Sequence, residues 1–498
     1  MPGDMFTTMY SGLKVLEKYM WLLDSYVLDY FTGRHWNKLP PSWRTTLEDV
    51  EPQELGYFIT QSCESYQRVW PLSLLALRVA SSCLSVTRDE VNFNNLFEEQ
   101  EEKESLCCDV DLAVKSNEPT VQSKQHSEDG LVINRHSEWQ VPDVTPCLKH
   151  PRLKYVFSKH VKPKKRHEIS RMAKVTASVA QMENCQFIVD IGSGLGHLAR
   201  LLAYGYGLKV CCLEAQQGLS RQARKLDMEL EVSVSKILDK NQFASLHRPV
   251  HLSMTLDSQL TANSFTEDLK MAFGASEEVF RFGIVGLHPC GDLAPILMHL
   301  FVECPNAKFI NIVGCCYMKL STGIVSGFNG YPMSKFLCTR PHSLSYGARE
   351  IACHAIEVYC QRLCVGQYED LKVHCYRAVL EKILTKHWPH LRHTMIKSIK
   401  HTTDMTFHQY ITLALSRLGL EVPIEDVTSE ETEINLLEWR RVVSFYTLRL
   451  MLAPLVESVL LRDRQLYLQE LDIHSELVPL FDPLLSPRNS ILIGRKKN

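Results

Sequence analysis

The stretch that decides the fold is FIVDIGSGLGH, residues 187–197. An apolar run around Asp190 is typical of a short buried strand. Three glycines follow this strand at once: Gly192, Gly194 and Gly196. A chain that turns sharply from a strand into a helix, with a ligand against its backbone, needs glycine where a Cβ would clash. The stretch therefore predicts a strand, a ligand-binding turn and a helix over 197–206.

A second apolar strand, residues 209–213, ends on Glu214. A carboxylate about 20 residues beyond a glycine turn can hold the hydroxyls of a ribose. Dinucleotide-binding turns have the spacing G-x-G-x-x-G, but this turn has G-x-G-x-G, and Asp190 before it would repel a pyrophosphate. The same acid suits the cationic amino-acid end of S-adenosylmethionine. We therefore predict that cofactor, and a glycine turn without a cofactor is the alternative.

The residues expected to line the cofactor lie at the ends of successive strands, where an open α/β sheet binds its ligands. A third strand, predicted over 250–256, ends at Asp257, the candidate partner of the adenine amino group. The predicted cofactor-binding set is Asp190, Gly192, Ser193, Gly194, Gly196, His197, Glu214, Asp257 and His288.

The composition of the chain is that of an ordinary globular protein. Its 498 residues are 45% hydrophobic and 22% charged, with a formal net charge of −2, so no global basic surface for nucleic acid or membrane is predicted. The 17 cysteines are odd in number, and the first residues do not resemble a signal peptide. Reduced thiols and an intracellular location, in the cytoplasm, the nucleus or both, are therefore expected.

The sequence divides into five parts by composition and periodicity. Apolar residues at helical spacing predict an N-terminal helical region, and the acidic, polar segment that follows it cannot bury enough apolar surface to fold. The predicted parts are a helical region (1–88), an acidic disordered linker (89–147), an α/β core (148–345), a helical insertion or lid (346–440) and a C-terminal helix with a terminal strand pair (441–498).

Residues 442–461 are apolar enough to resemble a membrane span. They also contain Arg449, Pro454 and Glu457, and a charge at the centre of a span is costly in lipid. A core helix packed against the sheet, with both charges reaching solvent or partners, is the favoured interpretation.

Two short loops follow the predicted strands 282–287 and 309–313 and carry a dense set of titratable groups. Because both loops face the glycine turn, a general base in them could take a proton from a nucleophile. The candidate catalytic residues are His288, Asp292 and Tyr317. Asp292 has an alternative role as the cap of the helix that follows it.

Basic and thiol side chains around the same edge are candidates for substrate contact: Lys164, Lys165, Cys316 and Lys319. The two lysines of the KPKKRHE stretch could equally belong to a solvated helix start. His288, Cys290, Cys315 and Cys316 are metal-ligand types, but the spacing is not that of a known zinc finger and adjacent cysteines seldom bind one tetrahedral ion. We expect no metal, and small buried residues at strand ends are the alternative role for these cysteines.

Several motifs together resemble the methyltransferase-like 25 family: FIVDIGSGLGHLARLLA, LHPCGDL, VGCCYMKL, KPKKRHEI and LSPRN. The resemblance runs from the N-terminal helices to the C-terminus and is weakest in the acidic segment. It implies a class I S-adenosylmethionine-dependent methyltransferase, with a Rossmann-like, seven-stranded α/β sheet. The paired H-x-C-G and C-C-Y motifs are also similar to those of a tRNA 2′-O-methyltransferase family.

This resemblance implies transfer of a methyl group to a macromolecule, with RNA slightly favoured over protein. An RNA or a ribosome-related protein is the expected partner. Adenine N6-dimethylases carry an N-[LIP]-P-[YF] loop after the fourth strand, whereas this chain has His288-Pro289-Cys290-Gly291, so base N6 dimethylation is not predicted. A protein methyltransferase, or a non-catalytic scaffold that retains the cofactor pocket, is the alternative.

Overall fold

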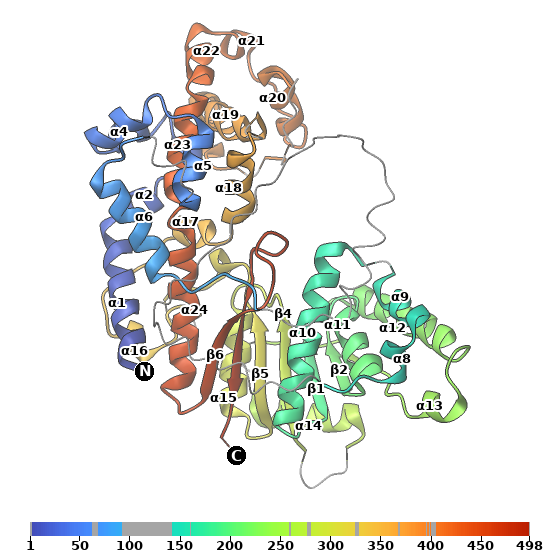
Figure 1. Ribbon diagram of the computed structural model, residues 1–498. Helices are drawn as coiled ribbons and strands as arrows, with labels where there is room; N and C mark the ends of the chain where they lie inside the picture. The colour runs from blue at the N-terminus through green and yellow to red at the C-terminus, as the bar shows by residue number, and fades with distance from the viewer. Residues whose placement is uncertain are drawn as a thin grey trace, which may run out of the picture.

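A single seven-stranded sheet organises the α/β part of the chain (Figure 1). Its strand order is β3-β2-β1-β4-β5-β7-β6, and only β7 runs opposite to the other strands, since it is antiparallel to both β5 and β6. The computed structural model describes residues 2–61, 68–91, 142–159, 161–257, 260–275, 280–323, 328–366, 369–394, 396–397, 399 and 405–497. The strands are β1 Phe187–Ile191, β2 Lys209–Leu213, β3 Val250–Leu252, β4 Phe282–Leu287, β5 Ala307–Val313, β6 His474–Pro479 and β7 Ser490–Arg495.

This strand order, with one antiparallel insertion beside β5, is that of the class I methyltransferase fold, and it confirms the predicted fold class. The terminal strand pair predicted near the C-terminus is present as β6 and β7. The β3 prediction was too long, since β3 ends at Leu252. Leu252 pairs with Leu213, the last residue of β2, so the hydrogen-bonded ladder ends there.

Helices cover both faces of the sheet. Side chains along β1 alternate between the faces, with Ile188 in one hydrophobic cluster and Val189 in the other. The first face carries α10 Pro163–Met182, α11 His197–Arg200, η5 Leu201–Gly205 and α12 Gln217–Val234. The second carries α14 Ala262–Phe273 and α15 Leu293–Glu303. The helix predicted over 197–206 is present as α11 continued by the π-helical turn η5.

A second, all-helical body rises beside the sheet (Figure 1). The N-terminal helices and the helices of 346–440 bury side chains in one shared hydrophobic cluster. The N-terminal group is α1 Pro2–Lys18, α2 Met20–Leu23, α3 His35–Lys38, α4 Pro41–Leu47, α5 Pro52–Thr60 and α6 Leu72–Leu84. The later group is α16 Lys335–Cys338, α17 Tyr346–Ile351, α18 Ile356–Cys364, α19 Val373–His387, α20 Phe407–Leu415, α21 Ile424–Val427 and α22 Glu430–Leu437.

Most of the predicted acidic linker, residues 92–141, lies outside the described residues. The remaining helical segments are α8 Pro146–Lys149, α9 Pro151–Ser158, α13 Lys240–Ala244, η1 Val27–Asp29, η6 Tyr317–Lys319, η7 Glu369–Lys372 and η8 Pro389–Leu391.

The apolar run near the C-terminus forms two successive helices, α23 Trp439–Leu450 and α24 Ala453–Gln469. By length and composition alone this 31-residue run could cross a membrane, because its most apolar 18-residue window has a mean hydropathy of 1.4, but 94% of that window is buried inside the protein. α24 packs against β6 and β7, as expected for a core helix.

The charges in this run reach partners rather than solvent. Arg449 donates to the carbonyls of Leu23 and Gly347, each at 2.9 Å. Glu457 accepts from Arg88 at 2.6 Å and from the Tyr317 hydroxyl at 2.9 Å. Each buried charge therefore has the hydrogen-bond partners that its burial requires.

Candidate functional site

The glycine turn follows β1 directly and has the backbone that only glycine adopts without strain. Gly192, Gly194 and Gly196 have φ angles of +66°, +56° and +69°. A Cβ on Gly192 or Gly194 would meet no protein atom within 4 Å, so open space lies against this backbone. The turn therefore offers a cradle for a ligand, and α11 begins directly behind it at His197.

Asp190, near the end of β1, is buried in an environment that disfavours its charged form. Its side chain is 2% exposed, and Oδ2 has no hydrogen-bond partner among the described residues. Burial raises the pKa of Asp190 to about 7, because a carboxylate loses its hydration there, although the charge of Lys165 opposes this shift. An unpaired buried oxygen of this kind fits a cationic ligand group.

Glu214 connects the end of β2 to the glycine turn. The backbone N–H of Gly194 donates to one carboxylate oxygen and that of Gln216 to the other, each at 2.9 Å. A carboxylate keeps further lone pairs when each oxygen accepts one bond, so Glu214 can still accept from a ligand. Asp257 lies five positions beyond β3 and is exposed. The structure thus brings Asp190, the turn and Glu214 together, and leaves Asp257 at the rim.

A buried network beneath the turn was not predicted from the sequence. Arg200 of α11 donates to Asp227 at 2.8 Å and to the carbonyl of Leu195 at 2.6 Å. The other oxygen of Asp227 lies 2.6 Å from Nε2 of His251 on β3. Arg200 also lies 2.9 Å from Nδ1 of His197. These contacts fix the turn to α12 and β3, and no local sequence signal connects residues so far apart.

His288 follows β4 and points to α10. Its backbone φ is +68°, and Nε2 lies 3.0 Å from Oε1 of Glu168, whose side chain is 1% exposed. Burial alone would raise the pKa of Glu168, but the hydrogen bond and charge of His288, with Lys165 and Ser486, lower it to about 2. The ionised carboxylate therefore accepts a hydrogen bond from Nε2–H, so the lone pair of the neutral ring lies on Nδ1. Nδ1 itself is buried without a hydrogen-bond partner among the described residues.

Asp292 does not cap α15. It occupies the N-cap position, but its side chain makes no capping hydrogen bond and instead accepts from the backbone N–H of Ser321 at 2.8 Å. A Cβ on Gly330 would overlap Oδ1 of Asp292, so this oxygen lies directly against that glycine. Asp292 therefore ties the loop after β4 to the chain beyond η6.

The expectation that Tyr317 lines an acceptor pocket is wrong for its side chain in this structure. Tyr317 is 1% exposed and belongs to the core of the helical body. Its hydroxyl donates to Glu457 of α24, and burial raises its pKa well above the usual value. Tyr317 therefore anchors η6 to α24, a partner 140 residues later in the chain.

The candidate substrate-contacting lysines lie on both sides of the His288 loop. Lys164 and Lys165 stand at the start of α10, half exposed, with their ammonium groups 3.9 Å and 3.4 Å from Glu168. Lys319 is exposed at the end of η6. The predicted helix start after Pro163 is confirmed. The exposed ammonium groups are accessible to an anionic substrate.

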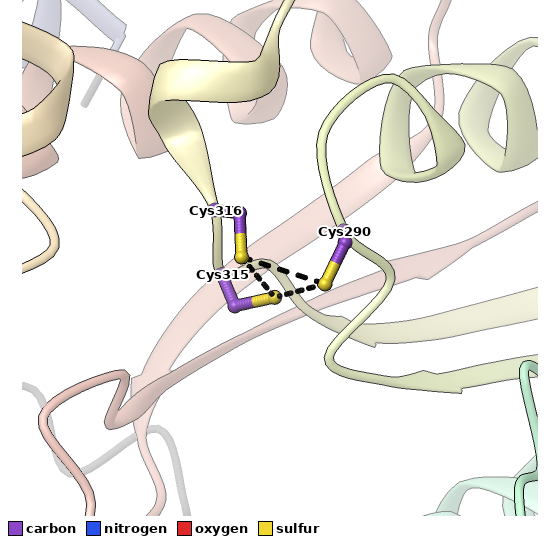
Figure 2. A group of neighbouring side chains, drawn as sticks. All are labelled: Cys290, Cys315 and Cys316. Carbon is purple, nitrogen blue, oxygen red and sulfur yellow. Dashed lines mark hydrogen bonds between the residues drawn. The ribbon is translucent and has the colours of Figure 1, made fainter. Parts of the chain in front are cut away.

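Three cysteines, by contrast, do not behave as buried strand-end residues. Cys290 is exposed and Cys315 and Cys316 are half-buried, and Figure 2 shows their sulfurs facing one another. The Sγ–Sγ distances are 3.1 Å for Cys290–Cys315, 3.5 Å for Cys290–Cys316 and 3.6 Å for Cys315–Cys316. The hydrogen bond from Cys315 lowers the pKa of Cys290 to about 5, and that of Cys315 is raised.

Residues 164–323 match a family model described as a methyltransferase domain. The chain contains a methyltransferase domain. The matched range includes the glycine turn, Glu214, His288 and the three cysteines, which are the features of the site described above. Glu168 of α10 also falls inside it.

The chain is also homologous to methyltransferase-like protein 25. It is 32% identical to the Mus musculus protein of that name in an alignment of 273 positions, which covers 52% of this chain and 42% of that protein. It is 25% identical to the Homo sapiens protein in an alignment of 455 positions, which covers 67% of this chain and 74% of that one. The match to the mouse relative therefore spans less than half of that relative's length. No solved structure matches this chain.

Proposed function

We propose that this protein is an S-adenosylmethionine-dependent methyltransferase that acts on a macromolecule. The observation that carries this proposal is the unpaired, buried oxygen of Asp190 beside a glycine turn with open space against its backbone. In this proposal Asp190 takes the ammonium group of the methionine part, Glu214 takes the ribose hydroxyls and Asp257 the adenine amino group. A pyrophosphate would meet a carboxylate at the position of Asp190, which disfavours a dinucleotide.

The remaining cofactor contacts follow from position. Ser193 and His197 belong to the same turn and its helix, and His288 faces it from the next parallel strand. The motifs LHPCGDL and VGCCYMKL favour the B-type member of the methyltransferase-like 25 family as the counterpart of this chain.

The chemistry then divides between the cofactor and the chain. Bound S-adenosylmethionine supplies the electrophilic methyl group. His288 is the proposed general base, since its Nδ1 carries the lone pair while Nε2 is held by Glu168. Glu168 positions the ring, and Asp292 acts through the Ser321 hydrogen bond rather than on the proton.

RNA is the favoured substrate, ahead of protein. Lys164, Lys165 and Lys319 place exposed positive charge beside the proposed base, which suits a phosphate backbone. The H-x-C-G and C-C-Y motifs, similar to those of a tRNA 2′-O-methyltransferase family, favour a hydroxyl acceptor. We propose an intracellular location for this activity.

Label transfer tests the function directly. Extract from cells that lack this protein is incubated with methyl-labelled S-adenosylmethionine and the purified full-length chain, then fractionated into RNA and protein. We expect label in RNA that depends on the chain and disappears with Asp190→Ala. Label confined to protein would replace RNA with a protein substrate, and no label in either fraction, with normal cofactor binding, would favour the non-catalytic scaffold.

The raised pKa of Asp190 predicts a pH dependence of cofactor binding. In the cofactor-free protein, burial favours the neutral form of Asp190. This group therefore contributes to the free energy of unfolding below its ordinary pKa of 3.8, and the contribution is lost as pH rises through about 7. A bound ammonium group would lower this pKa and release a proton. Affinity should therefore rise between about pH 5.5 and about pH 7, and level off above that range.

Calorimetric titrations in two buffers of different ionisation enthalpy measure both the affinity and the released proton. Asp190→Asn cannot release this proton, so its weaker affinity should not change with pH over the same range. A wild-type affinity that is flat across this range would remove Asp190 from the ammonium site.

A further inference from the structure

The thiol cluster of Cys290, Cys315 and Cys316 is not used by the proposed methyl transfer. It is built from two loops that meet at the carboxyl edge of the sheet, one after β4 and one after β5 (Figure 2). The three sulfurs form a nearly equilateral triangle with sides of 3.1 Å, 3.5 Å and 3.6 Å.

The backbone holds these loops close together before any ligand arrives. The N–H of His288 donates to the carbonyl of Val313 at 3.0 Å and extends the β4–β5 pairing into the loops. Gly291 has a φ of +56°, and a Cβ there would lie 2.9 Å from the carbonyl oxygen of Lys319. The approach of the loops therefore requires glycine, and it carries Cys290 to the other two thiols.

The adjacent pair Cys315–Cys316 differs from the other adjacent pair in the described residues, Cys211–Cys212 on β2. Cys211 and Cys212 are fully buried and belong to opposite faces of the sheet, as alternation along a strand requires. Cys315 and Cys316 lie beyond the end of β5, where this alternation no longer applies, and their sulfurs share one side. The general objection to adjacent cysteines as joint ligands does not hold for this geometry.

We propose that Cys290, Cys315 and Cys316 form a binding site for one thiophilic metal ion, and that this ion is Zn²⁺. Thiolates bound to a tetrahedral zinc at about 2.3 Å stand about 3.8 Å apart, slightly more than the distances observed here. All three distances are well beyond the roughly 2.05 Å of a disulfide. The triangle therefore needs only a small opening to accommodate the ion.

Three ligands leave one position of the tetrahedron open. Cys290 is exposed, so this position is accessible from outside, as in zinc sites that bind water or a substrate group. When zinc binds, the thiols release their protons to solvent and the thiolates form bonds to the ion. No oxidation state changes. Lys319, whose charge acts on Cys290, partly balances the negative charge of three thiolates around a divalent ion.

Cobalt substitution tests the site, since thiolate-bound Co²⁺ has a sulfur-to-cobalt charge-transfer absorption. The full-length, tag-free chain is reduced, freed of metal with a chelator and titrated with Co²⁺ and then Zn²⁺. We expect one cobalt ion per chain, the charge-transfer band, and its loss when zinc displaces cobalt. Cys290→Ser and Cys316→Ser should each weaken binding by about a hundredfold or more.

Cys338→Ser is the matched control, because Cys338 is also exposed but lies at the end of α16, outside the triangle. Thermal unfolding of each variant shows whether it remains folded, and Cys290 is exposed enough for serine to be tolerated there. Absence of the charge-transfer band in the wild type, or full binding in Cys290→Ser, would overturn the proposal. Cofactor titration of the same samples is independent of this result, so a failed metal site leaves the proposed methyl transfer standing.

Discussion

Replacing His288 with asparagine is expected to lower turnover by about 10²–10⁴-fold, with S-adenosylmethionine binding largely unchanged. The reason is that Nδ1 is the lone-pair nitrogen, while Nε2 is held by the ionised Glu168. Asparagine is the suitable substitution because it tolerates the φ of +68° at this position better than most residues. Turnover is measured on the substrate that label transfer identifies.

Two variants serve as controls for this result. Asp292→Asn keeps an Oδ1 that can accept from Ser321, so it should retain turnover if Asp292 only ties the loops together. His299→Asn removes another partly buried histidine, one that lies on α15 with its Nδ1 2.8 Å from the Tyr467 hydroxyl. Equal turnover in His288→Asn, Asp292→Asn and wild type would remove His288 from the chemistry, and loss in Asp292→Asn alone would transfer the role to Asp292.

Replacing Gly194 with alanine is expected to weaken S-adenosylmethionine binding by about tenfold or more. The new methyl group would occupy the open space against the turn, where the cofactor is expected to approach. Gly274→Ala is a close match, because Gly274 has a φ of +60° and equally open surroundings but caps α14 away from the turn. Both variants carry the same backbone strain, about 1–2 kcal/mol, and should unfold at similarly lowered temperatures.

Calorimetry then separates binding from strain. Weakened binding in Gly194→Ala with wild-type affinity in Gly274→Ala supports the cradle. If Gly194→Ala binds as tightly as Gly274→Ala, the cofactor does not lie against this turn.

The strand, the glycine turn and the acid at the end of β2 were predictable because each has a local signature. An apolar run, three glycines at positive φ and Glu214 lie within residues 187–214. The residue at which a strand ends depends instead on the neighbouring strand. β3 ends at the residue that pairs with the last residue of β2. The pairing of His288 with Glu168 joins residues 120 positions apart and has no local signal.

Tertiary contacts explain where the structure differs from the roles that the sequence suggested. Tyr317 was expected beside the crevice because it follows β5, but Glu457 of α24 accepts its hydroxyl in the core. Asp292 stands where a helix cap is expected, yet the Ser321 N–H competes successfully for its carboxylate. The exposed cluster of the cysteines after β4 and β5 is not predictable, because no sequence pattern shows that two loops will meet at Gly291.

The most direct measurement of the central claim is a calorimetric titration of the full-length chain with S-adenosylmethionine, with a nicotinamide dinucleotide titrated in parallel. We expect saturable binding of S-adenosylmethionine at one site per chain, no binding of the dinucleotide, and affinity lowered about tenfold or more in Glu214→Ala. Failure of the wild type to bind S-adenosylmethionine, unchanged affinity in Glu214→Ala, or tighter binding of the dinucleotide would contradict the assignment of this site.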